Sequence, residues 1–203
     1  GGFKEAIRLA DKLAEDINGF RPDQFNNMMN VRAHYSSTGL EITKKLNNID
    51  GFVSGIGTGG TLMGIGKRIK KKFPQAKIIA LEPKQMPILS EGINFGVHRI
   101  EGIGDDFIPS IVDKSLIDEV VLVDDEDAIN MSRILSKKFG LGVGISSGAN
   151  LLAAAVSGND NENIVTVFAD DSKKYLTTDL QKDINLDSSL ISNKLEIVSI
   201  EYV

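Results

Sequence analysis

The sequence predicts an α/β fold in which a twisted, mostly parallel sheet is flanked by helices. A strand pattern at 51–54 is followed by a glycine-rich turn, a helix pattern at 61–73 and a second strand pattern at 77–82. This order is that of a βαβ unit, whose two strands run parallel. Two further strand patterns, at 119–123 and 163–169, are expected to join the same sheet.

The chain before the first strand predicts helices. Apolar residues recur at helical spacing from Phe3 to Ile17, with charged residues between them. Asn30 is expected to cap a second helix, which runs over 31–46 and is interrupted by a glycine. The polar segment 24–27 between these two helices is the expected domain boundary.

Two more helices are predicted in the second half of the chain. Asp124 is expected to cap the helix after the third strand, and Asp127 nearly completes a capping box. A second glycine-rich stretch at 140–148 leads into an alanine- and leucine-rich helix at 149–156. Residues 194–203 alternate in polarity and predict a last edge strand.

The composition is that of an ordinary globular protein. Of the 203 residues, 41% are hydrophobic, and the net charge is −5. These values favour neither a nucleic acid nor a membrane as a partner, and the basic run at 67–72 is interpreted as a solvated helix end. The lack of cysteine excludes disulfides, thiolate metal sites and cysteine nucleophiles. We expect a cytoplasmic protein, and the missing initiator methionine suggests a fragment.

The glycine-rich turn at 55–61 gives the strongest functional signal. It joins a strand to a helix, and the N–H groups at a helix start suit a phosphate. Thr58 and Thr61 add hydroxyl donors to the same turn. The sequence therefore predicts a phosphate-binding site here.

The same turn also resembles a dinucleotide fingerprint. Gly55, Gly57 and Gly60 have the required spacing, and Glu82 ends the next strand where a ribose-binding acid would stand. A nicotinamide-dependent dehydrogenase therefore stays open, as does a turn whose glycines serve only the backbone.

Two other pairs of residues, the serines of the second glycine-rich stretch and the histidines, have both a functional and a structural interpretation. Ser146 and Ser147 lie between glycines, and Ser147 is interpreted as a helix N-cap. His34 and His98 are interpreted as surface or loop residues, and no metal site is expected.

The irregular, glycine-rich segment 92–106 is long enough to be functional. It contains Asp105 and Asp106, a carboxylate pair that belongs either to a solvated turn or to a site.

Several segments, in this order, resemble one enzyme family. Residues 55–62 read Gly-Ile-Gly-Thr-Gly-Gly-Thr-Leu, residues 101–109 read Glu-Gly-Ile-Gly-Asp-Asp-Phe-Ile-Pro, and residues 144–149 read Gly-Ile-Ser-Ser-Gly-Ala. These motifs, with 24–27 and 174–177, are similar to those of cysteine synthase (O-acetylserine sulfhydrylase) and its relative cystathionine β-synthase. The resemblance implies a pyridoxal-phosphate (PLP) enzyme of fold type II, with the tryptophan synthase β-like fold.

The resemblance assigns a role to individual residues. Ser146 corresponds to the serine that hydrogen-bonds the pyridine nitrogen, and its neutral hydroxyl would leave that nitrogen largely unprotonated. Gln24 corresponds to a residue near the substrate carboxylate, and Gly102 to a glycine of the loop that closes over substrate. The PLP phosphate is expected on five residues of the first turn: Gly57, Thr58, Gly59, Gly60 and Thr61.

One departure from the family concerns its catalytic lysine. In this family the Schiff-base lysine and the loop that grips the substrate carboxylate precede every segment seen here. Residues 1–27 are therefore expected to be the last helix and crossing segment of the N-terminal domain, and 28–203 the PLP-binding C-terminal domain. Such a chain should be inactive alone. Its expected partners are an amino-acid substrate, the missing N-terminal part and, for the intact enzyme, a second copy.

A second departure is Asp106, which stands where many cysteine synthases have glycine and cystathionine β-synthase-like members have aspartate. A carboxylate there could act as a base toward water or a second nucleophile. The implied reaction is PLP-dependent β-replacement on a serine or cysteine derivative, above all cysteine synthesis from O-acetylserine and sulfide. A hydrogen sulfide-producing cysteine lyase and a cystathionine-type enzyme are the alternatives.

Overall fold

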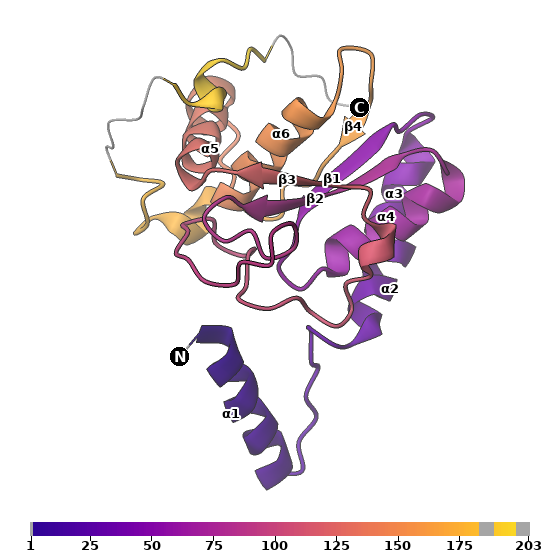
Figure 1. Cartoon of the computed structure of the whole chain (residues 1–203), viewed down its shortest axis with the longest axis vertical. Coiled ribbons are helices and arrows are strands. Elements are labelled where there is room, and N and C mark those ends of the chain that lie inside the picture. Colours follow the sequence, from indigo (N-terminus) through magenta and orange to yellow (C-terminus); the bar gives the residue numbers. More distant parts are fainter. Residues whose placement is uncertain (1, 183–188, 198–203) are drawn as a thin grey trace.

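A parallel sheet forms the centre of the molecule (Figure 1). The computed structural model describes residues 2–182 and 189–197, and in these the strand order is β3-β2-β1-β4. The strands are β1 (Gly51–Gly55), β2 (Lys77–Pro83), β3 (Glu119–Val123) and β4 (Ile164–Val165). All neighbouring strands pair in parallel, so the predicted α/β fold is confirmed.

Helices cover both faces of this sheet. In the described part of the chain they are α1 (Gly2–Asp16), α2 (Met28–Ser36), α3 (Thr38–Lys45), α4 (Gly60–Lys72), α5 (Asp125–Phe139) and α6 (Ile145–Ser157). Short 3₁₀ helices are η1 (Lys114–Leu116), η2 (Ser172–Tyr175) and η3 (Ile191–Asn193). Helices α2, α3 and α4 lie together on one side of the sheet, and α5 and α6 on the other (Figure 1).

The core consists of two layers because successive strand side chains point to opposite faces. Phe52 and Ile78 are buried with α4, whereas Val53 and Ile79 are buried with α5 and α6. Strands that are apolar on both faces are typical of a parallel sheet with helices on each side.

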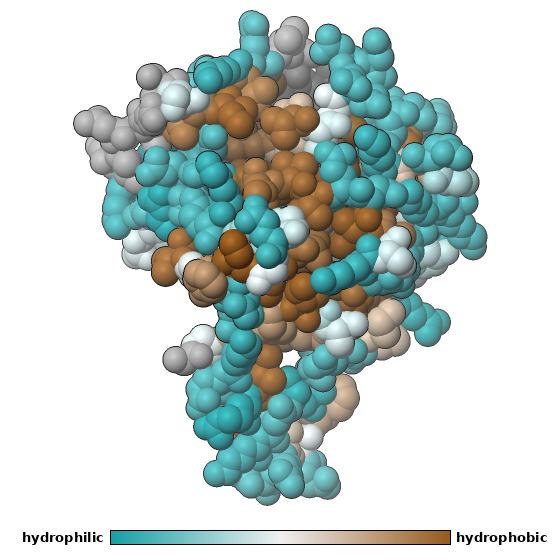
Figure 2. All heavy atoms as spheres, in the orientation of Figure 1, coloured by the Kyte–Doolittle hydropathy of each residue, from teal (hydrophilic) through white to brown (hydrophobic). Residues whose placement is uncertain are grey.

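Helix α1 stands apart from this body (Figure 1). Its Phe3, Leu9 and Leu13 side chains are more than half exposed. It reaches the rest of the chain through Phe3, whose ring packs edge-on against Phe25, which in turn packs against Phe107. Above α1, hydrophobic residues gather over the sheet on the face shown in Figure 2. The assignment of 1–27 to another domain stays a prediction.

The expected helix at 31–46 is two helices. The backbone breaks at Ser37, which has φ −113° and ψ −87°, and α2 is capped by Asn27, whose side chain accepts from the Met29 N–H at 2.9 Å. The prediction of Asn30 as the cap was therefore wrong. The predicted capping box at α5 was also wrong in part, because Asp124 caps the helix but the Asp127 carboxylate accepts from Ser192 instead.

The strand expected at 163–169 pairs only over β4. Beyond Val165, side chains replace the ladder: the Thr166 hydroxyl donates to the Val53 carbonyl at 2.9 Å. Asn150 accepts from the Gly55 N–H at 2.9 Å and donates to the Val167 carbonyl at 2.8 Å. Of the edge strand predicted at 194–203, residues 194–197 are not a strand, and the others lie outside the described residues.

Candidate functional site

A cavity of about 230 Å³ lies beyond the carboxyl end of β1, where open parallel sheets place their ligands. Its walls come from both glycine-rich turns, the 101–103 loop and the segment after β4. The lining residues that carry the argument below are Thr58, Thr61, Gly102, Ser146, Asp170 and Tyr175. The structure thus brings together residues from distant parts of the sequence.

The first glycine-rich turn presents a helix start and two hydroxyls to this cavity. Gly59 has φ +87°, a conformation that favours glycine, and it ends the turn as the N-cap of α4 without a side-chain cap. The Thr58 Oγ1 accepts from the Gly60 N–H at 3.2 Å and from the Asn30 side-chain amide at 2.9 Å. Gly57, Thr58, Gly59 and Thr61 line the cavity, whereas Gly60 does not.

His34 lies behind this turn. It is half-buried on α2, and its Nε2 is 3.4 Å from the Thr61 Oγ1, while its Nδ1 is 3.2 Å from Thr38. Burial lowers the pKa of His34, which favours the neutral ring. The interpretation of His34 as a surface or loop residue was therefore wrong, whereas His98 does lie in a loop.

The second glycine-rich turn places Ser146 in the first turn of α6, where it is buried and lines the cavity. Gly144, not Ser147, is the N-cap of this helix. Ser147 is fully buried, and its hydroxyl has no hydrogen-bond partner among the described residues. The prediction of Ser147 as the cap was wrong because the helix begins at Ile145, four residues earlier than expected.

Asp170 and Tyr175 form a polar pair in the wall next to α6. The Tyr175 hydroxyl donates to the Asp170 Oδ2 at 2.6 Å, and the Lys174 ammonium is 3.5 Å from the same oxygen. Burial, together with the Asp170 carboxylate, raises the pKa of Tyr175. The Asp170 Oδ1 is buried against Gly144 and has no partner within the described part of the chain.

Sequence reasoning missed Asn30 and Asn150 as site residues. Asn150 lines the cavity and joins the end of β1 to Val167. The sequence held a signal for it, since Asn150 lies one helical turn after Ser146 in a mostly apolar helix. Asn30 had been interpreted as a cap, and nothing in the sequence shows that it reaches Thr58.

The 101–106 loop covers the first turn. Gly102 and Gly104 have φ +90° and +75°, and the Gly104 N–H donates to the Ile56 carbonyl at 2.9 Å. Gly102 lines the cavity, and its role in a loop that closes over substrate stays a prediction. Burial, then the neighbouring Asp106 charge, raises the pKa of Asp105.

The structure does not bring Gln24 and Asp106 into the cavity wall. Asp106 pairs with Lys4 of α1 at 2.7 Å, and both side chains are about half exposed. Gln24 is exposed, and its carbonyl accepts from the Asn30 side chain at 3.0 Å.

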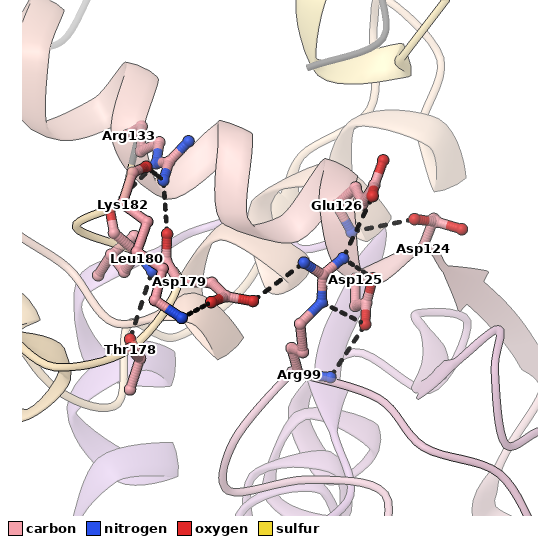
Figure 3. A network of polar contacts seen from close by, with 9 residues as sticks. All are labelled: Arg99, Asp124, Asp125, Glu126, Arg133, Thr178, Asp179, Leu180 and Lys182. Carbon is pink, nitrogen blue, oxygen red and sulfur yellow. Dashed lines mark hydrogen bonds and ion pairs between the residues drawn. The ribbon is translucent and has the colours of Figure 1, made fainter. Parts of the chain in front are cut away.

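Arg99 anchors the beginning of this loop (Figure 3). Its guanidinium donates to Asp125 at 2.7 and 3.0 Å and to Asp179 at 3.1 Å. The hydrogen bonds with Asp125 are the main cause of a raised pKa for Arg99. Arg99 thereby joins the loop that holds Gly102 to α5 and to the segment that follows Tyr175.

Glu82 is not available to a ribose. It is buried, and its carboxylate accepts from the backbone N–H groups of Leu89 at 2.7 Å and Ser90 at 2.9 Å. This weighs against the dinucleotide interpretation. The described residues contain no cluster of three or more potential metal ligands, and none of their helices could span a membrane.

Comparison with known proteins agrees with the geometry. The family model described as pyridoxal-phosphate dependent enzyme matches residues 1–170. The chain is 45% identical to cysteine synthase B of Campylobacter jejuni over 183 residues, which are 88% of this chain and 60% of that protein. The chain therefore spans about 60% of the length of the curated relatives it matches.

Two solved structures are also similar. A hydrogen sulfide-producing enzyme from Fusobacterium nucleatum matches with a TM-score of 0.90 and 48% identity, over 97% of this chain and 62% of that one. An O-acetylserine-dependent cystathionine β-synthase from Helicobacter pylori matches with a TM-score of 0.82 and 37% identity, over 87% and 59%. The resemblance drawn from the three motifs is confirmed.

Proposed function

Since the chain belongs to the pyridoxal-phosphate dependent enzyme family, we propose that its cavity holds PLP, with the phosphate on residues 57–61 and the ring nitrogen toward Ser146. The observation that carries this proposal is the single cavity that joins the two glycine-rich turns. Neither turn alone distinguishes PLP from another phosphate-bearing molecule.

The polar groups at both ends of the cavity fit this molecule. At the first turn, the start of α4 has a partial positive charge and uncapped N–H groups, which suit a phosphate. At the other end, Ser146 lines the cavity, and its hydroxyl can contact the ring. Glu82, which a dinucleotide would need, is already occupied.

When bound, PLP supplies an electron-accepting ring that eases loss of the α-proton of an amino acid. Ser146 offers the ring nitrogen a neutral partner, which keeps that nitrogen largely unprotonated. Tyr175 and Lys174 offset part of the Asp170 charge near the same end of the cavity. The 101–106 loop lies over Gly57 at the phosphate end of the cavity.

For the parent enzyme, we propose β-replacement on a serine or cysteine derivative, with cysteine synthesis from O-acetylserine and sulfide as the first candidate. The similarity to cysteine synthases supports it. Asp106 favours a second candidate, in which cysteine is the donor and hydrogen sulfide is released, because a carboxylate in the covering loop can act as a base toward water. For that role Asp106 must first separate from Lys4.

The Asp106→Asn variant of the intact enzyme tests this base. We expect fewer products with water as nucleophile and little change with sulfide, which needs no base. Unchanged product ratios with water, sulfide and thiols would exclude Asp106 from the reaction.

No lysine of the described chain lines the cavity. We therefore propose that the 203-residue chain binds PLP non-covalently, and that residues 1–27 belong to the domain that supplies the lysine. The substrate-contacting role of Gln24 and a homodimeric assembly belong to the same proposal for the intact enzyme.

Titration of the chain with PLP, pyridoxal and NADH tests the proposed cofactor. We expect saturable binding of PLP, followed by its absorbance, weaker binding of pyridoxal because it lacks the phosphate, and none of NADH. Binding of NADH without PLP would overturn the proposal and favour the dehydrogenase.

A further inference from the structure

The strongest unassigned feature is the contact between α2 and the phosphate-binding turn. We propose that Asn30 is a positioning residue that orients the Thr58 hydroxyl as a donor to the phosphate. This inference rests on the proposed function, and it adds a residue that contacts no ligand itself.

Hydrogen-bond geometry at Thr58 carries the argument. A hydroxyl oxygen can accept two hydrogen bonds and donate one. The Thr58 Oγ1 accepts one from the Asn30 amide at 2.9 Å and one from the Gly60 N–H at 3.2 Å. No acceptor for its own hydrogen exists among residues 2–182 and 189–197, so this hydrogen is left for an anion in the cavity.

The surroundings of Asn30 fix its side chain in this role. Its amide nitrogen also donates to the Gln24 carbonyl at 3.0 Å, which leaves Nδ2 with both hydrogens used. Its Oδ1 lies so close to Gly60 that a Cβ on that glycine would overlap it. The absence of a side chain at Gly60 is therefore what admits Asn30, and the same amide connects the turn to the segment that contains Gln24.

The role of Asn30 requires the hydrogens of its amide as well as the size of its side chain. An aspartate in this place has no hydrogen to give, and its oxygen would accept the Thr58 hydrogen instead of supplying one. The hydroxyl would then turn away from the phosphate, and the added negative charge would repel it. Asn30→Asp should thus impair phosphate binding more than Asn30→Ala, although it keeps the size of the side chain.

Comparison of PLP with pyridoxal tests this inference in the 203-residue chain. We expect Asn30→Ala to weaken PLP affinity about tenfold, the size of a lost hydrogen bond to a charged group, and to leave pyridoxal affinity unchanged. Asn30→Asp should weaken PLP affinity by more than Asn30→Ala does. Asn27→Asp is the matched control, since it adds the same charge three residues earlier at a position where aspartate also caps a helix.

A second experiment separates positioning from a general structural role. In a Thr58→Val background, which removes the hydroxyl and keeps the size, Asn30→Ala should cause no further loss of PLP affinity. Equal losses in both backgrounds, or equal losses for PLP and pyridoxal, would overturn the inference. Failure of the unmodified chain to bind PLP would instead overturn the proposed function.

Discussion

The two glycine-rich turns, at 55–61 and 140–148, look alike in sequence but use their glycines for different contacts. In the first turn, added Cβ atoms at Gly57 and Gly59 would meet the Gly102 carbonyl and Val112. Gly102 belongs to the 101–106 loop that covers the first turn, whereas Val112 packs against the core on the α4 side. Gly57 is therefore needed to let the covering loop approach.

In the second turn the close neighbours belong to the core and the cavity wall. A Cβ at Gly148 would overlap the Ala128 carbonyl and would lie 2.8 Å from the Ser132 N–H, both on α5. One at Gly144 would overlap the Asp170 carboxylate. The glycines here are needed for helix packing and for a wall residue.

The comparison shows that glycine content alone does not identify a ligand site. At Gly57 and Gly59 of the first turn, and at Gly144 and Gly148 of the second, protein atoms fill the space that a side chain would occupy. The functional difference comes from polar groups: the first turn offers hydroxyls and an uncapped helix start, whereas the second offers Ser146. Four substitutions, from the largest expected effect to the smallest, test this difference.

Gly148→Ala should have the largest effect, on stability. Alanine is favoured over glycine in a helix by about 1 kcal/mol, but overlap with the backbone of α5 should cost about 3 kcal/mol. The net loss in the free energy of unfolding, about 2 kcal/mol by these two values, is measured by urea denaturation. Ala155→Gly on the exposed side of α6 is the control and should show only the helix-propensity cost. A Gly148→Ala variant as stable as the unmodified chain would contradict the packing role.

Gly57→Ala should affect the ligand more than the fold. Its Cβ would displace the Gly102 carbonyl, and the covering loop can move because Gly102 itself is exposed. We expect a loss of less than about 1 kcal/mol in unfolding free energy and a fall in PLP affinity of about tenfold. Faster hydrogen exchange at the Gly104 N–H, which donates to Ile56, would report the loop movement. Slow exchange there with a large stability loss would mean that both turns serve the core.

The sequence predicted the features of the two turns that depend on the pattern of neighbouring residues. Short apolar runs predicted β1, β2 and β3, and each glycine-rich turn was placed before a helix. The proximity of Ser146 to the first turn was implied only by the family resemblance, because the second glycine-rich turn joins α5 to α6 and follows no strand. Both line the cavity.

The remaining features depend on contacts between distant segments. Asn30 has the sequence context of a helix cap, and its contact with Thr58 exists only because α2 packs on α4. The strand at 163–169 is short because Thr166 and Asn150 take over its hydrogen bonds. Neither the Asn30–Thr58 contact nor the short pairing of this strand produces a periodic pattern in the sequence. Neighbouring residues alone therefore could not predict them.

Gly140→Ala should have a smaller effect that comes from the backbone alone. Gly140 ends α5 with φ +69°, and no atom lies within 4 Å of a Cβ added there. An alanine should therefore cost about 1 kcal/mol in unfolding free energy because of strain, and PLP affinity should not change. Gly140→Asn should cost less, since asparagine tolerates this conformation. Equal losses for alanine and asparagine would point to packing instead.

Asp105→Asn should have the smallest effect, and it tests the cover of the first turn. Burial raises the pKa of Asp105, so the folded state disfavours the ionised carboxyl. The protonated Asp105 carboxyl therefore stabilises the folded state fully below the unfolded pKa of about 3.9. This stability is lost as the pH rises through the pKa of Asp105 in the folded state. The variant should therefore raise Tm at pH 7, where its amide carries no charge, and leave Tm nearly unchanged at pH 3.5. Asp160→Asn at an exposed position is the control. A gain in Tm that persists at pH 3.5 would show that the amide stabilises the loop for another reason. The 101–106 loop would then hold no charge that burial disfavours.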